Sequence, residues 1–149
     1  MTYISHSIED THVLAEQLAY HLKNLEKETA TVFLKGNLGT GKTALMKELA
    51  LVLNIEQEIT SPTYVISKEY SIELGHFKKL VHVDAYRLSE FDDFLKIGYG
   101  KRFGIAGDII CIEWPELVNE KDELKADIEI LSEYGEGESD RIYTVKFNS

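Results

Sequence analysis

Hydrophobic residues recur at helical spacing in two segments of the chain. In the first, leucines stand at positions 14, 18, 22 and 25, behind Ser7, whose side chain can cap a helix, and the acidic residues Glu9 and Asp10. We therefore predict an amphipathic helix from about Ser7 to Leu25. A second helix is predicted to begin near Lys42, with its apolar positions at Leu45, Leu49, Val52 and Leu53.

Short apolar runs predict strands between and after these helices. The segment Thr31–Lys35 is rich in β-branched and apolar residues and stops at Gly36, as a strand followed by a turn does. An alternating run from Tyr64 to Ile72 predicts a half-buried strand. The continuous apolar runs Leu80–Val83 and Ile109–Ile112 are typical of central strands that are covered on both faces.

The end of the chain adds two more predicted strands, around Ile128–Ile130 and Tyr143–Phe147, which the acidic loop 133–140 would join as a hairpin. Strands that alternate with helices indicate an α/β fold. We expect a mainly parallel central sheet with helices on both faces and antiparallel additions that include this C-terminal hairpin. Since no segment has the composition of a linker, residues 1–149 are expected to form a single domain.

Composition narrows the possible partners. With 16 basic and 26 acidic residues the chain carries a net charge of −10, which argues against binding DNA or RNA unaided and against docking on an anionic membrane. Cys111 is the only cysteine, so an internal disulfide and a cysteine-rich metal site are excluded. The sequence shows neither a long apolar run nor a secretory signal, so we expect a cytoplasmic protein.

Residues 36–43 read Gly-Asn-Leu-Gly-Thr-Gly-Lys-Thr and match the phosphate-binding P-loop pattern G-x-x-x-x-G-K-[ST], between a predicted strand and a predicted helix. The glycines allow successive backbone N–H groups to turn towards phosphate oxygens, and the helix directs its positive end at the same anion. Lys42 is expected to reach the β- and γ-phosphates of a nucleotide, and the Thr43 hydroxyl to bind Mg²⁺. A glycine-rich turn with a surface lysine is the alternative. The residues expected at the nucleotide are Asn37, Leu38, Gly39, Thr40, Gly41, Lys42, Thr43 and Ala44.

Two acidic residues follow predicted strands directly. Asp84 ends the strand Leu80–Val83 and Glu113 ends the strand Ile109–Ile112. Ligands of open α/β sheets bind beyond the carboxyl ends of the strands, so both acids should lie on the same edge as the P-loop. There they would hold Mg²⁺ and orient an attacking water, although each could also be an ordinary solvated carboxylate. With Lys42, they are the candidate catalytic residues.

Several further residues are candidates that also have an ordinary structural interpretation. Thr60 belongs to a Thr-Ser-Pro-Thr segment that could sense a γ-phosphate or could be an ordinary turn. Trp114, the only tryptophan, could cover the nucleotide or contact a partner, or could simply be a core aromatic. Arg87 could stabilise charge or form a salt bridge, and Arg141 lies in no recognisable motif. His82 is expected to be a satisfied core residue.

Four segments occur in a fixed order: the P-loop, Thr-Ser-Pro-Thr at 60–63, His-Val-Asp-Ala-Tyr-Arg-Leu at 82–88 and Ile-Glu-Trp-Pro-Glu at 112–116. This set resembles the TsaE family, the P-loop ATPases of bacterial tRNA threonylcarbamoyladenosine biosynthesis. The resemblance runs from about Ser7 to Val145. Many families share the P-loop, whereas the combination of the other three segments is far more specific.

The resemblance implies an ATPase that requires Mg²⁺, is weak alone and supports repeated turnover of its partners TsaB and TsaD. Those partners transfer a threonylcarbamoyl group to adenosine 37 of certain tRNAs, so tRNA would be contacted only through them. The resemblance assigns phosphate and metal binding to Lys42 and Thr43 and the metal and water site to Asp84 and Glu113. It makes 60–63 a switch-like segment and puts Trp114 at the nucleotide or partner face. This chain departs from the family at Gly100, Lys101 and Arg102, where acidic residues are usual.

Two other functions remain open from the sequence. A small-molecule P-loop kinase usually needs a lid of arginines over the phosphates, and three scattered arginines make such a lid hard to assemble. A nucleotide-gated binding module would use Asp84 and Glu113 for affinity alone. A GTPase is disfavoured because the Asn-Lys-x-Asp signature is absent: residues 119–122 read Asn-Glu-Lys-Asp.

Overall fold

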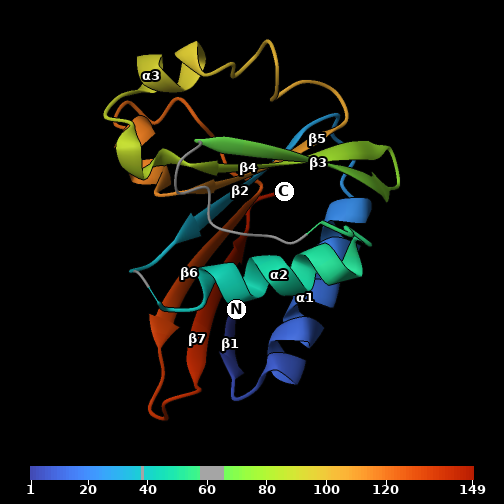
Figure 1. Ribbon diagram of the computed structural model, residues 1–149, viewed down its shortest axis with the longest axis vertical. Coiled ribbons are helices and arrows are strands. Elements are labelled where there is room, and N and C mark those ends of the chain that lie inside the picture. Colours follow the sequence, from blue (N-terminus) through green and yellow to red (C-terminus); the bar gives the residue numbers. More distant parts are fainter. Residues whose placement is uncertain (38, 58–65) are drawn as a thin grey trace.

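A computed structural model describes residues 1–37, 39–57 and 66–149. Within these residues seven strands form one sheet in the order β1-β7-β6-β2-β5-β4-β3 (Figure 1). The strands are β1 (Thr2–Ser5), β2 (Ala30–Lys35), β3 (Ser67–Leu74), β4 (Phe77–Asp84), β5 (Asp108–Glu113), β6 (Ile128–Tyr134) and β7 (Arg141–Phe147). The helices are α1 (Ile8–Lys23), α2 (Lys42–Val52) and α3 (Phe91–Lys96), with 3-10 turns η1 (Ala85–Arg87) and η2 (Pro115–Val118).

The centre of the sheet is parallel and its edges are antiparallel. Strands β6, β2, β5 and β4 run parallel to one another, whereas β3 pairs antiparallel with β4, and β7 with both β6 and β1. This arrangement confirms the predicted α/β fold with its C-terminal hairpin, β6–β7. The edge strand β1 and the helix α3 were not predicted, because each is too short to show a hydrophobic period.

Helices α1 and α2 cover one face of the sheet (Figure 1). The prediction for α1 is accurate to within two residues: Ser7 is the N-cap, and its hydroxyl accepts a hydrogen bond from the backbone N–H of Asp10. Leucines of both helices are buried against alternate residues of the central strands, such as Val32 on β2 and Ile109 on β5. The alternating burial of β3 is also as predicted, with Tyr70 and Ile72 inside, although the predicted start of that strand at Tyr64 lies outside the described residues.

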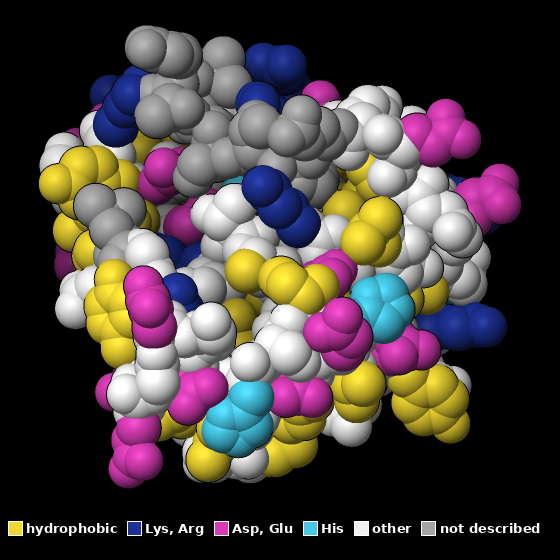
Figure 2. All heavy atoms as spheres, turned by 60° about the horizontal axis from the view of Figure 1, so that its bottom comes forward, with side chains coloured by type: hydrophobic (Ala, Val, Ile, Leu, Met, Phe, Trp, Pro, Cys, Tyr) yellow, Lys and Arg dark blue, Asp and Glu magenta, His cyan; other side chains and the backbone are white. Residues whose placement is uncertain are grey.

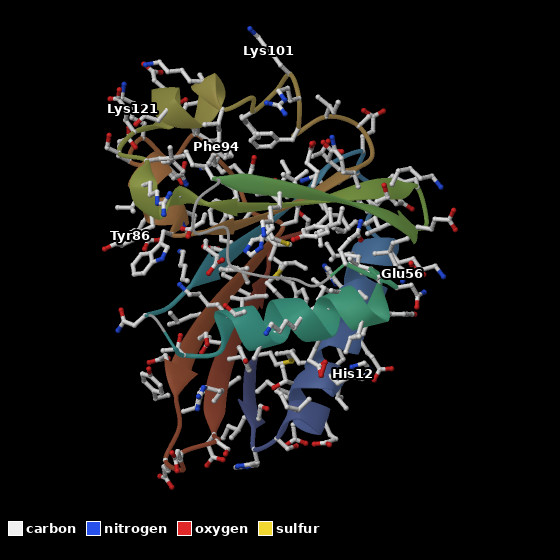
Figure 3. All side chains as sticks on the ribbon, viewed as in Figure 1. His12, Glu56, Tyr86, Phe94, Lys101 and Lys121 are labelled. Atoms are coloured by element: carbon white, nitrogen blue, oxygen red, sulfur yellow. The ribbon has the colours of Figure 1, made fainter. Side chains whose placement is uncertain are left out.

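The other face of the sheet is covered by less regular structure. Phe94 of α3 is fully buried against Ile110 and Ile112 of β5, together with Phe103 and Val118. Figure 3 shows Phe94 pointing from α3 towards the sheet. Helices therefore lie on both faces, as predicted, but this second layer is one short helix supplemented by 3-10 turns and the loop after α3. The strand β5 is buried along its whole length because both layers reach it.

Candidate functional site

Three neighbouring strands end side by side at the edge of the sheet. In the pairing register Glu113 of β5 lies between Leu34 of β2 and Asp84 of β4. The P-loop follows β2 directly and runs into α2. The structure therefore brings Asp84 and Glu113 to the edge where the P-loop lies, as the sequence predicts.

The backbone of the P-loop needs its glycines. Gly36, Gly39 and Gly41 have φ angles of +136°, +77° and +114°, which are strongly disfavoured for residues that have a Cβ atom. Gly41 is the N-cap of α2 and no side chain caps the helix there, so the first backbone N–H groups of α2 are left for a ligand. A helix of this length with an uncapped, glycine-rich N-terminus is suited to binding a phosphate group.

The C-terminal hairpin β6–β7 braces this loop from the side. Tyr143 of β7 is fully buried and donates a hydrogen bond from Oη to the carbonyl oxygen of Gly41 at 2.9 Å. The Ser132 hydroxyl of β6 donates to the carbonyl oxygen of Thr40. Thr40 in turn donates from Oγ1 to the carbonyl oxygen of Asn37 at 2.6 Å. The loop is therefore held by side chains 92 and 102 residues away in the chain, which no local pattern reveals.

Lys42 is buried at the centre of the site. Its side chain is 5% exposed, and its Nζ has no hydrogen-bond partner among the described residues. The Nζ lies 3.7 Å from Oε1 of Glu113 and 4.5 Å from the ring centre of Trp114. A buried ammonium without hydrogen bonds is costly, and a nearby carboxylate and an aromatic face compensate for that only in part. This lysine is thus aimed at the site with its donors unused, as an anion-binding lysine would be.

Glu113 is held from two sides. Its Oε1 faces Lys42, and its Oε2 accepts a hydrogen bond of 2.6 Å from Nε2 of His82 on β4. Burial of Glu113 favours its neutral form, but the hydrogen bond and charge of His82 and the charge of Lys42 outweigh it and hold the pKa of Glu113 below its usual value. The carboxylate is therefore ionised at neutral pH. His82, expected to be an ordinary core residue, is part of the site.

Asp84 and Trp114 flank this cluster. Asp84 is half-buried, and its Oδ1 accepts a hydrogen bond from the backbone N–H of Tyr86 at 3.0 Å, which starts the turn η1. Trp114 has a left-handed backbone with φ +58°, an uncommon state for a bulky residue, which turns the chain sharply after β5. The rings of Tyr86 and Trp114 lie 5.3 Å apart between centres. Arg87 is exposed on η1.

Two clefts flank the loop. The first, which we call the phosphate cleft, has a volume of about 260 Å³ and is lined by Gly39, Gly41, Lys42, Thr43, Ala44, Glu113 and Arg141. The second, the outer cleft, has a volume of about 550 Å³ and lies beside Asn37, Thr40, Trp114 and Tyr134. The predicted nucleotide residues thus divide between two adjoining clefts. Leu38 and Thr60, also predicted to bind the nucleotide, lie outside the described residues.

Arg141 of β7 was not predicted to be at the site, and the hairpin brings it there. Its guanidinium donates to the carbonyl oxygens of Glu138 and Asp140 and lies 5.3 Å from the ring centre of Tyr134. It supplies a second positive side chain to the phosphate cleft. The sequence placed Arg141 only between the predicted loop 133–140 and the predicted strand around Tyr143–Phe147, which does not say what lies across from it.

The described residues give a limited choice of metal ligands. No three histidine, cysteine or acidic side chains gather there as a metal-binding group. Mg²⁺ commonly takes one or two protein oxygens and completes its shell with water and phosphate, so Thr43 with Asp84 or Glu113 suits a nucleotide-bound ion and not a free metal site. No helix in the described part of the chain is long and apolar enough to cross a membrane.

The departure at Gly100, Lys101 and Arg102 lies away from this site. Figure 3 shows Lys101 on the α3 side of the sheet, pointing away from it. The face seen in Figure 2 carries scattered acidic side chains, and its lysines and arginines form no broad patch.

Comparison with known proteins gives one consistent result. The profile described as "Threonylcarbamoyl adenosine biosynthesis protein TsaE" matches residues 5–142. The chain is 38% identical over 132 residues to the tRNA threonylcarbamoyladenosine biosynthesis protein TsaE of Aquifex aeolicus, covering 87% of each chain. It is 38% identical over 119 residues to the TsaE protein of Treponema pallidum, covering 79% of this chain and 81% of the relative.

A solved structure agrees with the sequence comparisons. The crystal structure of YdiB from Bacillus subtilis superposes with a TM-score of 0.69 at 25% identity, over 100% of this chain and 86% of that one. The profile match spans most of the chain, and the P-loop, Asp84, Glu113 and Trp114 all fall inside it. The chain therefore belongs to the TsaE family.

Proposed function

We propose that this chain binds and hydrolyses ATP with Mg²⁺, as the ATPase component of tRNA threonylcarbamoyladenosine biosynthesis, and that its activity depends on TsaB and TsaD. The observation that carries the proposal is the buried cluster of Lys42 and Glu113 beside an uncapped, glycine-lined helix N-terminus. Membership of the family supports the pathway.

The residues present fit Mg²⁺-ATP. A Cβ on Gly39 or Gly41 would lie within 2.7 Å of a tyrosine hydroxyl, so the phosphate-binding loop can lie this close to the hairpin β6–β7 only with glycine at these positions. Lys42 provides a buried ammonium that has no hydrogen-bond partner in the described part of the chain. When bound, Mg²⁺-ATP supplies the γ-phosphoryl group and a cation that offsets charge on the phosphate oxygens.

We assign the steps of ATP binding and hydrolysis to residues of this chain. Backbone N–H groups of the loop and the first turn of α2 bind the phosphates, and Lys42 neutralises charge on the β and γ groups. Thr43 and Asp84 hold the metal. Glu113, ionised and fixed, accepts a hydrogen bond from the attacking water and orients it. Trp114 covers the same side of the site.

The geometry also suggests why such an enzyme would be slow by itself. Lys42 lies against Glu113 and Trp114, and these contacts must loosen for Nζ to reach a phosphate. The outer cleft, with a volume of about 550 Å³, lies beside Asn37 and Trp114 at this edge, and removing water from such a cleft strengthens the electrostatic interactions inside it. Partners that cover this edge would remove water. Because this chain has a net charge of −10, we expect those partners, and not this chain, to bind tRNA.

The test is Mg²⁺-ATP hydrolysis by the purified chain, with and without the TsaB–TsaD pair of its own organism. We expect weak turnover that rises several-fold with the pair. Lys42→Ala should abolish nucleotide binding or turnover, whereas Lys101→Ala, an exposed lysine far from the site, should change neither. Full activity of Lys42→Ala would refute the site.

A second pair of variants separates chemistry from binding. Glu113→Ala should slow hydrolysis more than it weakens ATP binding, and Glu56→Ala, which removes an exposed carboxylate at the far end of α2 (Figure 3), should do neither. Equal losses for Glu113→Ala would place this residue in the binding shell. Rapid ATP turnover that is unchanged by TsaB and TsaD and that yields a phosphorylated small molecule would establish the kinase alternative.

A further inference from the structure

His82 lies in the core beneath the site and touches it through one contact. It is 1% exposed in the middle of β4, between Val81 and Val83, whose side chains lie in the opposite layer of the core. It pairs in register with Cys111 of β5, so Glu113, two residues further along β5, lies on the same face of the sheet. From there Nε2 reaches Oε2 of Glu113 at 2.6 Å.

The remaining ring nitrogen of His82, Nδ1, is buried and makes no compensating hydrogen bond with the residues that the structure describes. Buried polar atoms are nearly always paired, and an unpaired one costs stability. An apolar side chain would suit this part of β4 better, as at Leu80 and Val81. The contribution of His82 that an apolar residue could not make is therefore its hydrogen bond to Glu113.

The two carboxylate oxygens of Glu113 contact two different groups, of which only one moves in the proposed function. The contact at Oε1 is the 3.7 Å ion pair with Lys42, and the contact at Oε2 is the hydrogen bond from His82. In the proposed function Lys42 moves to the phosphates, which frees Oε1. The bond to Oε2 comes from a residue fixed in the sheet and does not depend on the nucleotide.

We propose that His82 is a positioning residue, which fixes the Glu113 carboxylate through Oε2 so that Oε1 faces the attacking water once Lys42 has moved to the phosphates. The proposal rests on the proposed ATPase function. Because a carboxylate only accepts hydrogen bonds, the proton of the pair lies on Nε2 of His82. Without this bond Glu113 would rotate among its rotamers, and orientation would be lost while the phosphate-binding loop stayed intact.

Two amide variants test this with matched polarity. In His82→Gln the side-chain amide nitrogen occupies nearly the position of Nε2 and can still donate to Glu113. In His82→Asn the amide ends near the position of Nδ1 and cannot reach it. The measurements are kcat of the partner-activated ATPase, the affinity for Mg²⁺-ADP followed by the fluorescence of Trp114, the only tryptophan, and the melting temperature.

We expect kcat to fall about tenfold or more in His82→Asn and by only a few-fold in His82→Gln, with Mg²⁺-ADP affinity within about threefold of the parent in both. Equal kcat in the two variants overturns the proposal, and so does an affinity that falls in parallel with kcat. The parent and Lys42→Ala are measured in the same series. If the parent itself shows no turnover above Lys42→Ala, the proposed function fails, which is distinct from failure of the role of His82.

A measurement on the unaltered ring keeps the proposal testable if neither amide variant folds. In protein labelled with nitrogen-15 at histidine, the Nε2–H proton of His82 should be slow to exchange with water, because it is buried and bonded. It should be lost from the spectrum or exchange rapidly in Glu113→Ala. Absence of this proton in the parent, or its persistence unchanged in Glu113→Ala, overturns the hydrogen bond on which the proposal depends.

Discussion

Replacing Gly41 with alanine tests whether the C-terminal hairpin confines the phosphate-binding loop. Gly41 has a φ angle of +114°, and a Cβ atom placed there would lie 2.5 Å from Oη of Tyr143 and 3.2 Å from Cγ of Arg141. Arginine can move aside, but Tyr143 is fully buried and cannot turn without disturbing the core. We therefore expect backbone strain and steric overlap to add in Gly41→Ala.

The expected loss follows from these two contributions. A non-glycine residue held at such a φ angle costs about 1–3 kcal/mol, and overpacking of a close-packed site costs about 1–3 kcal/mol more. We expect Gly41→Ala to lower the free energy of unfolding by about 4 kcal/mol, or roughly 12 °C in melting temperature. Gly100→Ala is the matched control, because φ is +84° and, apart from its chain neighbours, no atom of the described residues lies within 4 Å of its Cβ. It should lose only about 1–2 kcal/mol.

The assay is urea unfolding followed by circular dichroism, with Tyr143→Phe and the double variant included. Tyr143→Phe removes the overlapping oxygen together with its hydrogen bond to Gly41, a loss of about 1 kcal/mol. Because the overlap disappears in the double variant, its loss should be about 1–2 kcal/mol smaller than the sum of the two single losses. Additive losses, or equal losses for Gly41→Ala and Gly100→Ala, would refute the idea that the hairpin confines the loop.

Three further predictions rest on other contacts. Burial raises the pKa of Cys111 to about 12, so a thiol reagent should leave the folded protein unmodified and react only on addition of urea; rapid labelling of folded protein would contradict this. Arg141→Ala should weaken Mg²⁺-ADP binding about tenfold, measured by Trp114 fluorescence, since it removes a cation from the phosphate cleft, and unaltered affinity would exclude Arg141 from binding. The hydrogen bond and charge of Asp140 raise the pKa of His6 above 6.5, and the hydrogen bond from His6 lowers the pKa of Asp140 below 3.8. Between pH 3.8 and pH 6.5 His6 is therefore charged and Asp140 ionised, and the ion pair is lost as the pH rises through the raised pKa of His6. His6→Ala should lower the melting temperature more at about pH 5.5 than at about pH 8.5. An equal decrease at the two pH values would exclude a stabilising ion pair.

The presence of the central strands, though not their order in the sheet, could be predicted because each strand carries its own signal. Val32–Leu34 and Ile109–Ile112 are apolar throughout, as expected of strands buried on both faces, and both belong to strands that are central in the sheet. Asp84 and Glu113 stand directly after such strands, so parallel pairing alone brings them together at one edge. The P-loop could be predicted because its chemistry is local: glycines, a lysine and a threonine at fixed spacing.

The sequence was less informative where a residue's role depends on what lies across the fold. His82 looks like a core histidine from its apolar neighbours, and only the register of β4 against β5 brings its Nε2 to Glu113. Short elements such as β1 and α3 also gave no signal, because their stability comes from pairing with β7 and from burying Phe94, not from local propensity.

The sequence by itself determined the strands of the central sheet, the phosphate-binding loop and the two carboxylates at the edge of the sheet, because each has a signal in neighbouring residues. Only the tertiary structure decided what holds these parts. Tyr143 and Ser132 of the hairpin bind the loop across 102 and 92 residues of chain, Arg141 of the same hairpin lines the cleft beside it, and His82 holds Glu113 from another strand. Periodicity and motif spacing describe contacts along the chain, whereas these contacts depend on strand order and register, which the whole core sets together.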